Sequence, residues 1–555
     1  MPGRARNILF IMYDQLRFDY LSCAGHPFLE TPNMDRLAET GVRFSRCYVQ
    51  SPICGASRMS FYTGRYAHSH GAQWNGFPLK VGELTLGDHM RRIGMDCWLV
   101  GRTHMRADAE GMRRLGLEPD SIVGARVSEC GFDVFVRDDG LWAHGPDGYY
   151  DDGRSPYNAY LNSKGYAGEN PWHDYANAGI DEDSNMASGF LLMNADREAN
   201  VEEPDSETPW LTSRAIEFLD KHVGGTSKPW LCHLSYIKPH WPYIAPAPYH
   251  DMYGGNQIVP VHRNHAELEN AHPVYAAFTR NPISKALSQK EVRERVISAY
   301  MGLIKQCDDQ LGRLLDHMEA SGRMEDTMIV LTSDHGDYLG DHWLGEKNLF
   351  HEASVKVPLI IYDPDREADS TRGSICDALV ESIDTVATFV EAGGGAVPDH
   401  IVEGRSLLPF VRGKALDSWR DYVISEYDYS VSPIAAGLGL SPRDARLFMV
   451  ADKRWKFVHA EGGMRSMLFD LETDPDEFVD LGECPHHAKV RDMMYERLGQ
   501  WARRMSQRTT RSDDEIEAMR GKSERRGIVL GARDATDVEQ ELISKYVGSP
   551  GRGAG

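Results

Sequence analysis

The sequence lacks any apolar run long enough to cross a membrane. No stretch approaches the ~20 apolar residues that a bilayer-spanning helix requires. Met1–Arg6 lead directly into the first apolar segment, without the apolar core of a secretory leader. Cysteine is also scarce, with 9 in 555 residues and no paired spacing, which is typical of reduced thiols rather than of a disulfide framework. We therefore expect a cytoplasmic protein that makes no membrane contact.

Basic residues are in the minority. The chain has 61 Lys and Arg against 83 Asp and Glu, a formal net charge of -22. This charge opposes nucleic-acid binding, which depends on basic surfaces that displace counterions. An acidic exterior also repels anionic substrates at long range, so cationic groups that bind an anion have to act within a cleft.

The arrangement of apolar segments predicts an α/β fold. Strand-like runs such as Val357–Tyr362 alternate with helical patterns such as Ala378–Val390 up to about residue 410. From about residue 420 the pattern changes to short strands at 447–450, 456–458 and 466–470, followed by a helix through 493–498. Long polar insertions at about 103–200 and 245–290 are expected to be surface excursions, with pocket walls or subunit contacts as the alternative.

Four of the predicted strands end in polar residues. These residues are Asp14-Gln15, Arg102 to His104, Lys238 to His240, and Ser333-Asp334-His335. A satisfied loop residue explains each ending taken alone. In open α/β sheets, however, ligands bind outside the carboxyl ends of the strands. If the four strands are neighbours, their polar residues converge on one crevice.

The side chains in this predicted crevice have a definite chemistry. Asp14, Gln15, Asp334 and His335 offer oxygen donors and one imidazole, a set suited to Ca2+ or Mn2+. Around them, cationic or proton-donating side chains could bind a tetrahedral oxyanion. These are Arg58, Arg102, His104, His240 and Lys347. The predicted ligand is therefore a small anionic ester.

A nucleophile is predicted in the segment 51–58. Ser57–Thr63 reads as a short helix that Gly64 ends, so Cys54 would lie at its N-terminus. A thiol at that position is expected to be acidified and exposed. The alternative is a buried structural cysteine followed by a surface arginine.

Together these segments resemble the type I sulfatases of the alkaline phosphatase superfamily, specifically the branch that contains the phosphonate monoester hydrolases. The resemblance covers roughly residues 5–500, in the same order. The matching segments are Asp14-Gln15, Thr31–Ala38, Cys54–Arg58, Gly101–His104, Pro239-His240, Ser333–Gly336, Lys347 and Leu468–Glu477.

The resemblance implies an architecture. It is a mixed, mainly parallel sheet sandwiched by helices, with a small antiparallel C-terminal subdomain. We expect a catalytic α/β domain over residues 1–415, the C-terminal sheet and helix over 416–505, and a tail over 506–555. Comparable tails join subunits in this branch, so the resemblance implies a homo-oligomer, a dimer or tetramer.

The resemblance also implies residue roles. Cys54 would be oxidised to formylglycine by a formylglycine-generating enzyme, and its hydrated aldehyde would be the nucleophile. Residue 54 would ligate one divalent metal ion with Asp14, Gln15, Asp334 and His335, and Asp334 would help to deprotonate the nucleophile. Arg58 would orient residue 54. The remaining roles are anion binding and leaving-group assistance by Arg102, His240 and Lys347, hemiacetal collapse by His104, and substrate contact by Asn75, for which a turn residue before Gly76 is the alternative.

Two positions depart from the family pattern. Ala56 stands where the modification signature usually has Pro, and Gln15 stands where many sulfatases have a second Asp. Sulfate monoesters, phosphonate monoesters and phosphodiesters all carry one negative charge, so promiscuity is expected. The first hypothesis is a sulfuric ester hydrolase with these side activities. The alternatives are a phosphonate monoester hydrolase or phosphodiesterase, and a catalytically silent anion- or metal-binding protein.

Overall fold

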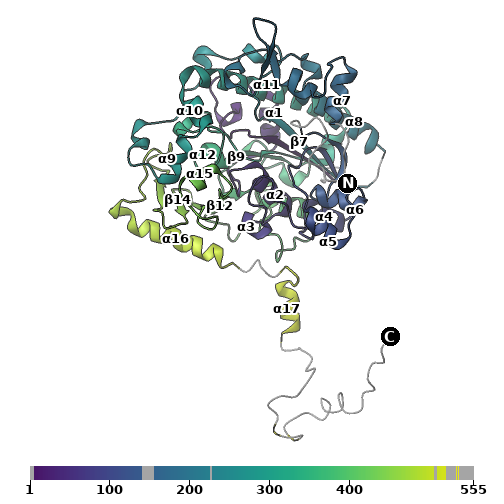
Figure 1. The fold of residues 1–555 in the computed structure, drawn as a ribbon. Helices are drawn as coiled ribbons and strands as arrows, with labels where there is room; N and C mark the ends of the chain where they lie inside the picture. The colour runs from purple at the N-terminus through teal and green to yellow at the C-terminus, as the bar shows by residue number, and fades with distance from the viewer. Residues whose placement is uncertain are drawn as a thin grey trace.

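The computed structural model describes residues 6–139, 155–225, 228–504 and 509–520, with 533 and 536. A nine-stranded sheet lies between helices, and a four-stranded antiparallel sheet lies beside it (Figure 1). In order across the large sheet, the strands are β10 (Ser374–Cys376), β2 (Val42–Tyr48), β9 (Lys356–Tyr362), β8 (Thr327–Ser333), β1 (Asn7–Asp14), β7 (Trp230–Pro239), β3 (Asp96–Gly101) and β4 (Asp133–Arg137), with β11 (Val380–Glu381) also paired to β2.

Both faces of the large sheet are covered. Successive side chains of a strand point to opposite faces, and β1 alternates accordingly: Ile8 and Phe10 lie in one hydrophobic core, whereas Leu9 and Ile11 lie in the other. The first core contains α2 (Cys54–Thr63), α4 (Leu86–Arg92) and α13 (Asp384–Ala392). The second contains α1 (Pro32–Thr40), α8 (Glu207–Glu217) and the long α11 (Lys290–Ala320). This explains why β1 reads as a continuous apolar run.

The four strands with polar ends are neighbours. β1 pairs in parallel with β8 on one side and with β7 on the other, and β7 pairs in parallel with β3. Their carboxyl ends therefore meet at one edge of the sheet, as the sequence predicted. Only β9 runs antiparallel to its neighbours in this sheet, among the strands that the structure describes. The predicted mixed, mainly parallel α/β fold is confirmed.

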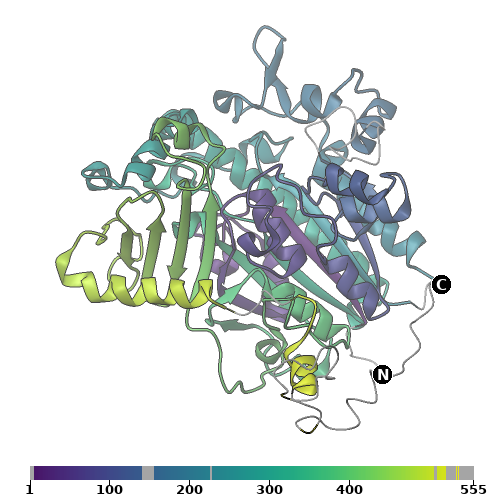
Figure 2. The same cartoon turned by 60° about the horizontal axis from the view of Figure 1, so that its bottom comes forward.

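The C-terminal part is a small antiparallel sheet with one helix on it. Its strands are β12 (Val423–Asp428), β13 (Arg446–Ala451), β14 (Trp455–Ala460) and β15 (Met467–Asp470). Helix α16 (Ala488–Ala502) lies across the strands and buries Met494, Leu498 and Trp501 against them (Figure 2). The domain bounds at 415 and 505 stay predictions. Most of the tail, including its apolar positions 528–530 and 542–543, lies outside the described residues.

Two sequence-based expectations differ from the structure. The helix predicted at 378–390 begins only at Asp384, because Val380 and Glu381 pair with the backbone of β2 instead. An available strand edge here outweighs the local helical pattern. The insertion at 103–200 is also more than a surface excursion, since its strand β4 extends the sheet next to β3. The same insertion carries the hairpin of β5 (Ala178–Ile180) and β6 (Met186–Ser188), which projects from the body at the top of Figure 2.

The expectation that no segment crosses a membrane can be compared with the helices of the structure. Within the described ranges, none of the helices combines the length and the apolar content that a bilayer crossing demands.

Gly101, the last residue of β3, lies against the backbone of β7. Its φ is 112°, and a β-carbon would lie 2.1 Å from the carbonyl oxygen of Ser235. Gly101→Ala should therefore lower the free energy of unfolding by roughly 3 kcal/mol or more, through strain plus overlap. Gly94→Ala is the matched control, since Gly94 has φ 87° but nothing within 4 Å of the added carbon, and should cost only about 1–2 kcal/mol. Equal losses in urea unfolding would contradict this packing.

Candidate active site

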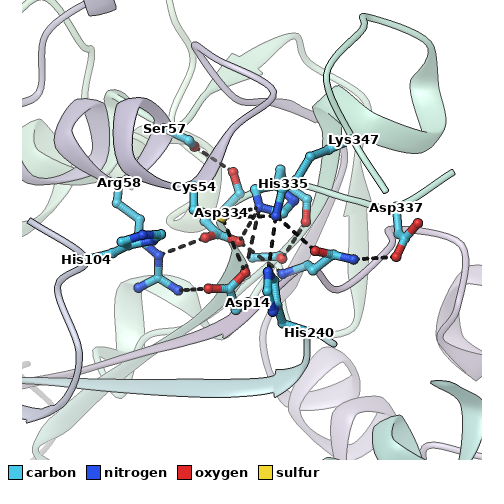
Figure 3. A network of polar contacts seen from close by, with 12 residues as sticks. Asp14, Cys54, Ser57, Arg58, His104, His240, Asp334, His335, Asp337 and Lys347 are labelled. Atoms are coloured by element: carbon cyan, nitrogen blue, oxygen red, sulfur yellow. Dashed lines mark hydrogen bonds and ion pairs between the residues drawn. The ribbon is translucent and has the colours of Figure 1, made fainter. Parts of the chain in front are cut away.

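The centre of the site is a cluster of four buried side chains at the carboxyl edge of the sheet. Asp14 ends β1, Asp334 and His335 follow β8, and Cys54 begins α2. One ligand atom from each of these residues lies within 4.8 Å of the others, and all four residues are buried (Figure 3). Segments more than 300 residues apart in the chain thus meet because their strands are adjacent.

Arg58 holds the two carboxylates together. Its Nε donates to Asp334 Oδ2 at 2.7 Å and its Nη2 lies 3.1 Å from Asp14 Oδ2. A third donation, from Nη1 to Ser235 Oγ at 2.8 Å, ties the guanidinium to β7. Arg58 comes from the same helix as Cys54, one turn later, and its side chain has no solvent exposure. The surface arginine considered from the sequence alone is therefore wrong.

The proton positions on His335 follow from its hydrogen bonds. Its Nδ1 lies 2.8 Å from the carbonyl oxygen of Gly336, which can only accept, so Nδ1 carries the proton. Nε2 is then an unprotonated nitrogen, 3.0 Å from Cys54 Sγ. Burial lowers the pKa of His335 to about 4, against the opposing influence of Asp334. The imidazole therefore presents a free lone pair to the centre of the cluster.

The side-chain amide of Gln15 contacts different partners through its oxygen and through its nitrogen. Its Oε1 accepts from Lys347 Nζ at 3.0 Å, whereas its Nε2 donates to Asp337 and, at 2.9 Å, to the hydroxyl of Tyr243. Asp337 also accepts from the Tyr243 hydroxyl at 2.5 Å. Its carboxylate is an acceptor for both neighbours, so it pairs with the NH2 group of Gln15 and not with the Gln15 oxygen. The amide oxygen of Gln15 is thus directed toward Lys347 and the interior of the site.

The loop that carries Lys347 folds back over the cluster, as its glycines suggested. Lys347 Nζ lies 3.1 Å from Cys54 Sγ and 3.2 Å from His240 Nε2. Burial alone would lower the pKa of Lys347, but Cys54 and Asp14 raise it above its usual value. His240 donates from Nδ1 to the carbonyl oxygen of Trp241 at 2.8 Å, so its Nε2 accepts from Lys347.

The expectation of an acidified, exposed thiol is wrong. Cys54 is 1% exposed. Burial, followed by the negative charge of Asp14, raises the pKa of Cys54 to about 12. The helix N-terminus favours a thiolate, but it is outweighed because the thiol has left water and faces a carboxylate.

Asp14 behaves in the opposite way. Burial would raise its pKa, yet the guanidinium groups of Arg58 and Arg102 hold the pKa of this carboxyl well below its usual range. Arg102 Nη2 lies 3.4 Å from Asp14 Oδ2 and donates to His104 Nδ1 at 2.6 Å. Since His104 Nδ1 accepts, its proton is on Nε2. Burial and the charge of Arg102 lower the pKa of His104 well below its usual value.

A cavity of about 390 Å³ opens onto the cluster. Asn75 lines it and is fixed there, because its Oδ1 accepts from the backbone N–H of Gly55 at 2.7 Å. This contact leaves the amide NH2 of Asn75 for other partners. The other predicted residues in the wall are Cys54, Arg102, His104, His240 and Lys347. The structure thus brings all the predicted site residues to this cavity or to the cluster beneath it.

Sequence reasoning missed several residues of the site. Asp337 and Tyr243 orient Gln15, and Trp74, Trp241 and Glu346 line the cavity. Each is within three residues of a predicted site residue in the sequence. That proximity was the only signal, because no sequence pattern distinguishes a loop aspartate or tryptophan that supports a site residue from one that faces solvent.

Comparison with protein families gives two matches. Residues 6–395 match the family described as Sulfatase, and residues 340–504 match the C-terminal region described for N-sulphoglucosamine sulphohydrolase. The first match spans most of the large sheet and every residue of the cluster.

Individual relatives cover nearly the whole chain. The chain is 31% identical to the multifunctional alkaline phosphatase superfamily protein PehA of Trinickia caryophylli, over 88% of this chain and 93% of that protein. It is 28% identical to an arylsulfatase of Clostridium perfringens, over 86% and 90%. Among solved structures, a phosphonate monoester hydrolase from Silicibacter pomeroyi superposes with a TM-score of 0.77 at 28% identity, over 89% of this chain and 94% of that one.

Arg58 is the cation that makes the buried carboxylate pair tolerable. Arg58→Met should lower the free energy of unfolding by roughly 3–5 kcal/mol, because the buried Asp334 then loses its cation and Asp14 keeps only Arg102, at 3.4 Å. Urea unfolding in the presence of a chelator measures this without compensation by a cation. Arg36→Met is the control, since Arg36 pairs with the exposed Asp316 and should cost at most about 1 kcal/mol. A similar, small loss for both variants would contradict the role given to Arg58.

Proposed function

This chain belongs to the sulfatase family, and we propose that it hydrolyses sulfate monoesters, with phosphonate monoesters and phosphodiesters as secondary substrates. One observation carries the proposal. A residue in the position of the family's nucleophile, Cys54, lies within 4.8 Å of the carboxylate and imidazole donors and beneath a cavity lined by cationic side chains. Such an arrangement combines a nucleophile with groups that stabilise negative charge.

Cys54 is proposed to act as formylglycine, whose hydrated aldehyde supplies the attacking hydroxyl. The neighbours of Cys54 suit a group that carries oxygen in place of sulfur. His335 Nε2 and Lys347 Nζ lie within 3.1 Å of the Sγ position, and Asp14 Oδ1 lies 3.8 Å from it. Lys347 can donate to an oxygen at that position.

One divalent cation is the second proposed component. Asp14, Asp334, the Gln15 amide oxygen, His335 Nε2 and residue 54 would hold it. Their donor chemistry fits, because carboxylate and amide oxygens with one unprotonated imidazole suit a hard or intermediate ion, Ca2+ or Mn2+. The cation would supply Lewis-acid stabilisation of developing negative charge. The proposal rests on the convergence of these donor atoms, because Arg58, Arg102 and Lys347 already balance the charge of the two buried carboxylates.

The remaining residues bind and orient the ester. Lys347, with its raised pKa, stays protonated and can donate to a sulfate oxygen. Arg102 and the free amide NH2 of Asn75 offer further donors from the cavity wall. His240 is neutral and its Nε2 accepts from Lys347, so His240 can orient the Lys347 ammonium, which gives one proton to the departing alcohol oxygen and becomes a neutral amine. His104, which carries its proton on Nε2, completes the ring of donors.

Phosphonate monoester or phosphodiester hydrolysis as the main activity is the alternative. The neutral Gln15 favours it, because this amide removes one negative charge from the metal's ligand set. The likeness to a phosphonate monoester hydrolase structure is also consistent with it. A silent binding protein is disfavoured, because every proposed ligand and cation is present and converges.

Localisation and partners complete the proposal. A cytoplasmic location is supported by the nine cysteines, none of which forms a disulfide. Maturation by a formylglycine-generating enzyme and assembly into a homo-oligomer, a dimer or tetramer, are proposed by analogy with the family.

The activity can be tested with matched aryl esters. Protein produced together with a formylglycine-generating enzyme should give a higher kcat/KM on 4-nitrophenyl sulfate than on 4-nitrophenyl phenylphosphonate. Mass spectrometry of the peptide that contains Cys54 should show the thiol replaced by an aldehyde. Cys54→Ala should lower both activities by roughly 1000-fold or more. A far higher kcat/KM on the phosphonate would favour the alternative, and an intact thiol in active protein would sink the nucleophile assignment.

The orientation of Gln15 can be tested through metal affinity. Asp337 accepts from Gln15, from Tyr243 and, through Oδ1 at 2.9 Å, from the backbone N–H of Leu339. The single side-chain oxygen in Asp337→Asn cannot accept from all three donors. The Gln15 amide should then lose its fixed orientation, and Mn2+ affinity in a chelator competition should fall about 10- to 100-fold. Gln15→Glu should also weaken binding, because its carboxylate would face Asp337.

The double variant Gln15→Glu with Asp337→Asn is the decisive control. The new amide at position 337 can donate to the new carboxylate at position 15 and still accept from the Leu339 N–H, so the double variant should recover most of the Mn2+ affinity. Tyr243→Phe, which removes one of three donors to Asp337, should have a smaller effect than Asp337→Asn. Losses that simply add in the double variant would contradict the orienting contact.

A further inference from the structure

The wall of the active-site cavity is aromatic beyond the charged cluster. Trp241 directly follows His240, lines the cavity, and has its ring centroid 4.5 Å from that of His240. Trp74 lines the same cavity and stacks on Tyr427 at 5.7 Å with an interplanar angle of 19°. Both indoles are half-buried. The space around the reacting centre is therefore bounded by two flat apolar surfaces.

Aromatic packing continues from Trp241, beyond the residues that line the cavity, onto the insertion at 103–200. Phe190, just after β6, packs edge-on against Trp241 at 5.7 Å and is 42% exposed. It is held from other sides by His173, whose ring stacks on it at 5.6 Å, and by the buried Trp172 at 6.3 Å. Exposed phenylalanine rings are usually free to move, but this one is fixed by three rings. Trp241 and Phe190, which we call the aromatic wall, thus form a preorganised apolar surface.

The charge of the cavity wall limits what can enter. Glu346 precedes Lys347 and lines the cavity. Asp139, also in the wall, pairs with Arg137 at 2.6 Å. An alcohol group with its own negative charge would face the Glu346 carboxylate at close range, where screening by salt is weak.

We propose that the alcohol portion of the substrate is aromatic, carries no negative charge, and packs on the aromatic wall of Trp241 and Phe190. This inference rests on the proposed sulfate ester hydrolysis and names the substrate class for it. Esters of phenols and larger aryl alcohols fit these surfaces, whereas sulfated acidic polysaccharides do not. The cationic residues hold the anion, while the aromatic wall and Glu346 select what the anion is attached to.

The size preference is tested with two sulfates whose leaving groups have similar acidity. Mature enzyme should have a higher kcat/KM on 2-naphthyl sulfate than on phenyl sulfate. Trp241→Ala and Phe190→Ala should each reduce this ratio about 5- to 50-fold, because the larger ring loses its packing surface. Trp241→Ala keeps the backbone carbonyl that accepts from His240. Ile122→Ala, at a 70% exposed position on α6 (Ile122–Ser128), is the control and should leave the ratio unchanged.

The charge preference is tested with a second pair of sulfates. Wild-type enzyme should prefer 4-carbamoylphenyl sulfate over 4-carboxyphenyl sulfate, and Glu346→Gln should reduce that preference about fivefold or more. An unchanged preference in Glu346→Gln, or naphthyl-to-phenyl ratios that neither Trp241→Ala nor Phe190→Ala changes, would overturn the inference. If wild-type enzyme hydrolyses no sulfate ester but does hydrolyse phosphonates, the proposed function fails first, and the same ratios on aryl phosphonates then decide the inference.

The mass of the protein in solution tests whether the exposed segment around Phe190 forms a subunit contact instead. If Phe190→Ala halves the mass of the assembly, residues around Phe190 form a subunit contact, and the inference is overturned. An unchanged mass together with a reduced naphthyl preference supports it.

Discussion

The whole site depends on two carboxylates buried with one guanidinium. Asp14, Asp334 and Arg58 have no exposed side-chain surface, so all three charges have lost their hydration. Removing ions from water costs several kcal/mol each, and their attraction offsets this only when the geometry is good. Here Arg58 bonds to both carboxylates and to Ser235, so the geometry is good but the charges do not cancel. Arg102 and Lys347 from other loops bring further positive charge to the cluster, so the suitability of the centre for a divalent cation rests on its converging donor atoms rather than on unbalanced negative charge.

Backbone carbonyls, rather than acidic side chains, set the protonation of the two central histidines. His335 donates to the carbonyl of Gly336 and His240 to that of Trp241, in each case the next residue in the chain. The loop conformation therefore fixes which nitrogen is free. A carboxylate in that place would have raised the pKa of the imidazole, whereas a carbonyl leaves each ring neutral in its buried position. Lys347 then remains the cationic member of its pair with His240.

Much of the large sheet and of its central cluster could be predicted from the sequence. Strands buried on both faces read as continuous apolar runs, and parallel neighbours bring their ends together, so Asp14, Asp334 and His335 followed from local patterns. The state of Cys54 did not follow, because its pKa depends on burial and on Asp14, which the local helix signal does not contain. The helix predicted at 378–390 was displaced by pairing with β2, a contact between distant segments. Asp337 and Tyr243 escaped notice because a supporting contact leaves no periodicity in the sequence.

The structure divides catalysis and selection between different kinds of segment. Apart from Lys347, which a loop carries, the charged groups stand at or just beyond strand ends and in the first turns of α2, where the backbone is fixed by sheet pairing and helix bonds, and charge stabilisation needs such fixed positions. Trp241 lies one residue beyond that framework, and Phe190 lies in an insertion. Apolar contact falls off less sharply with small displacements than a hydrogen bond does, so a wall made by loops can serve it. A protein that keeps the charged residues can therefore come to accept a different alcohol portion of the substrate through changes in its insertions alone, because these changes leave the buried charges undisturbed.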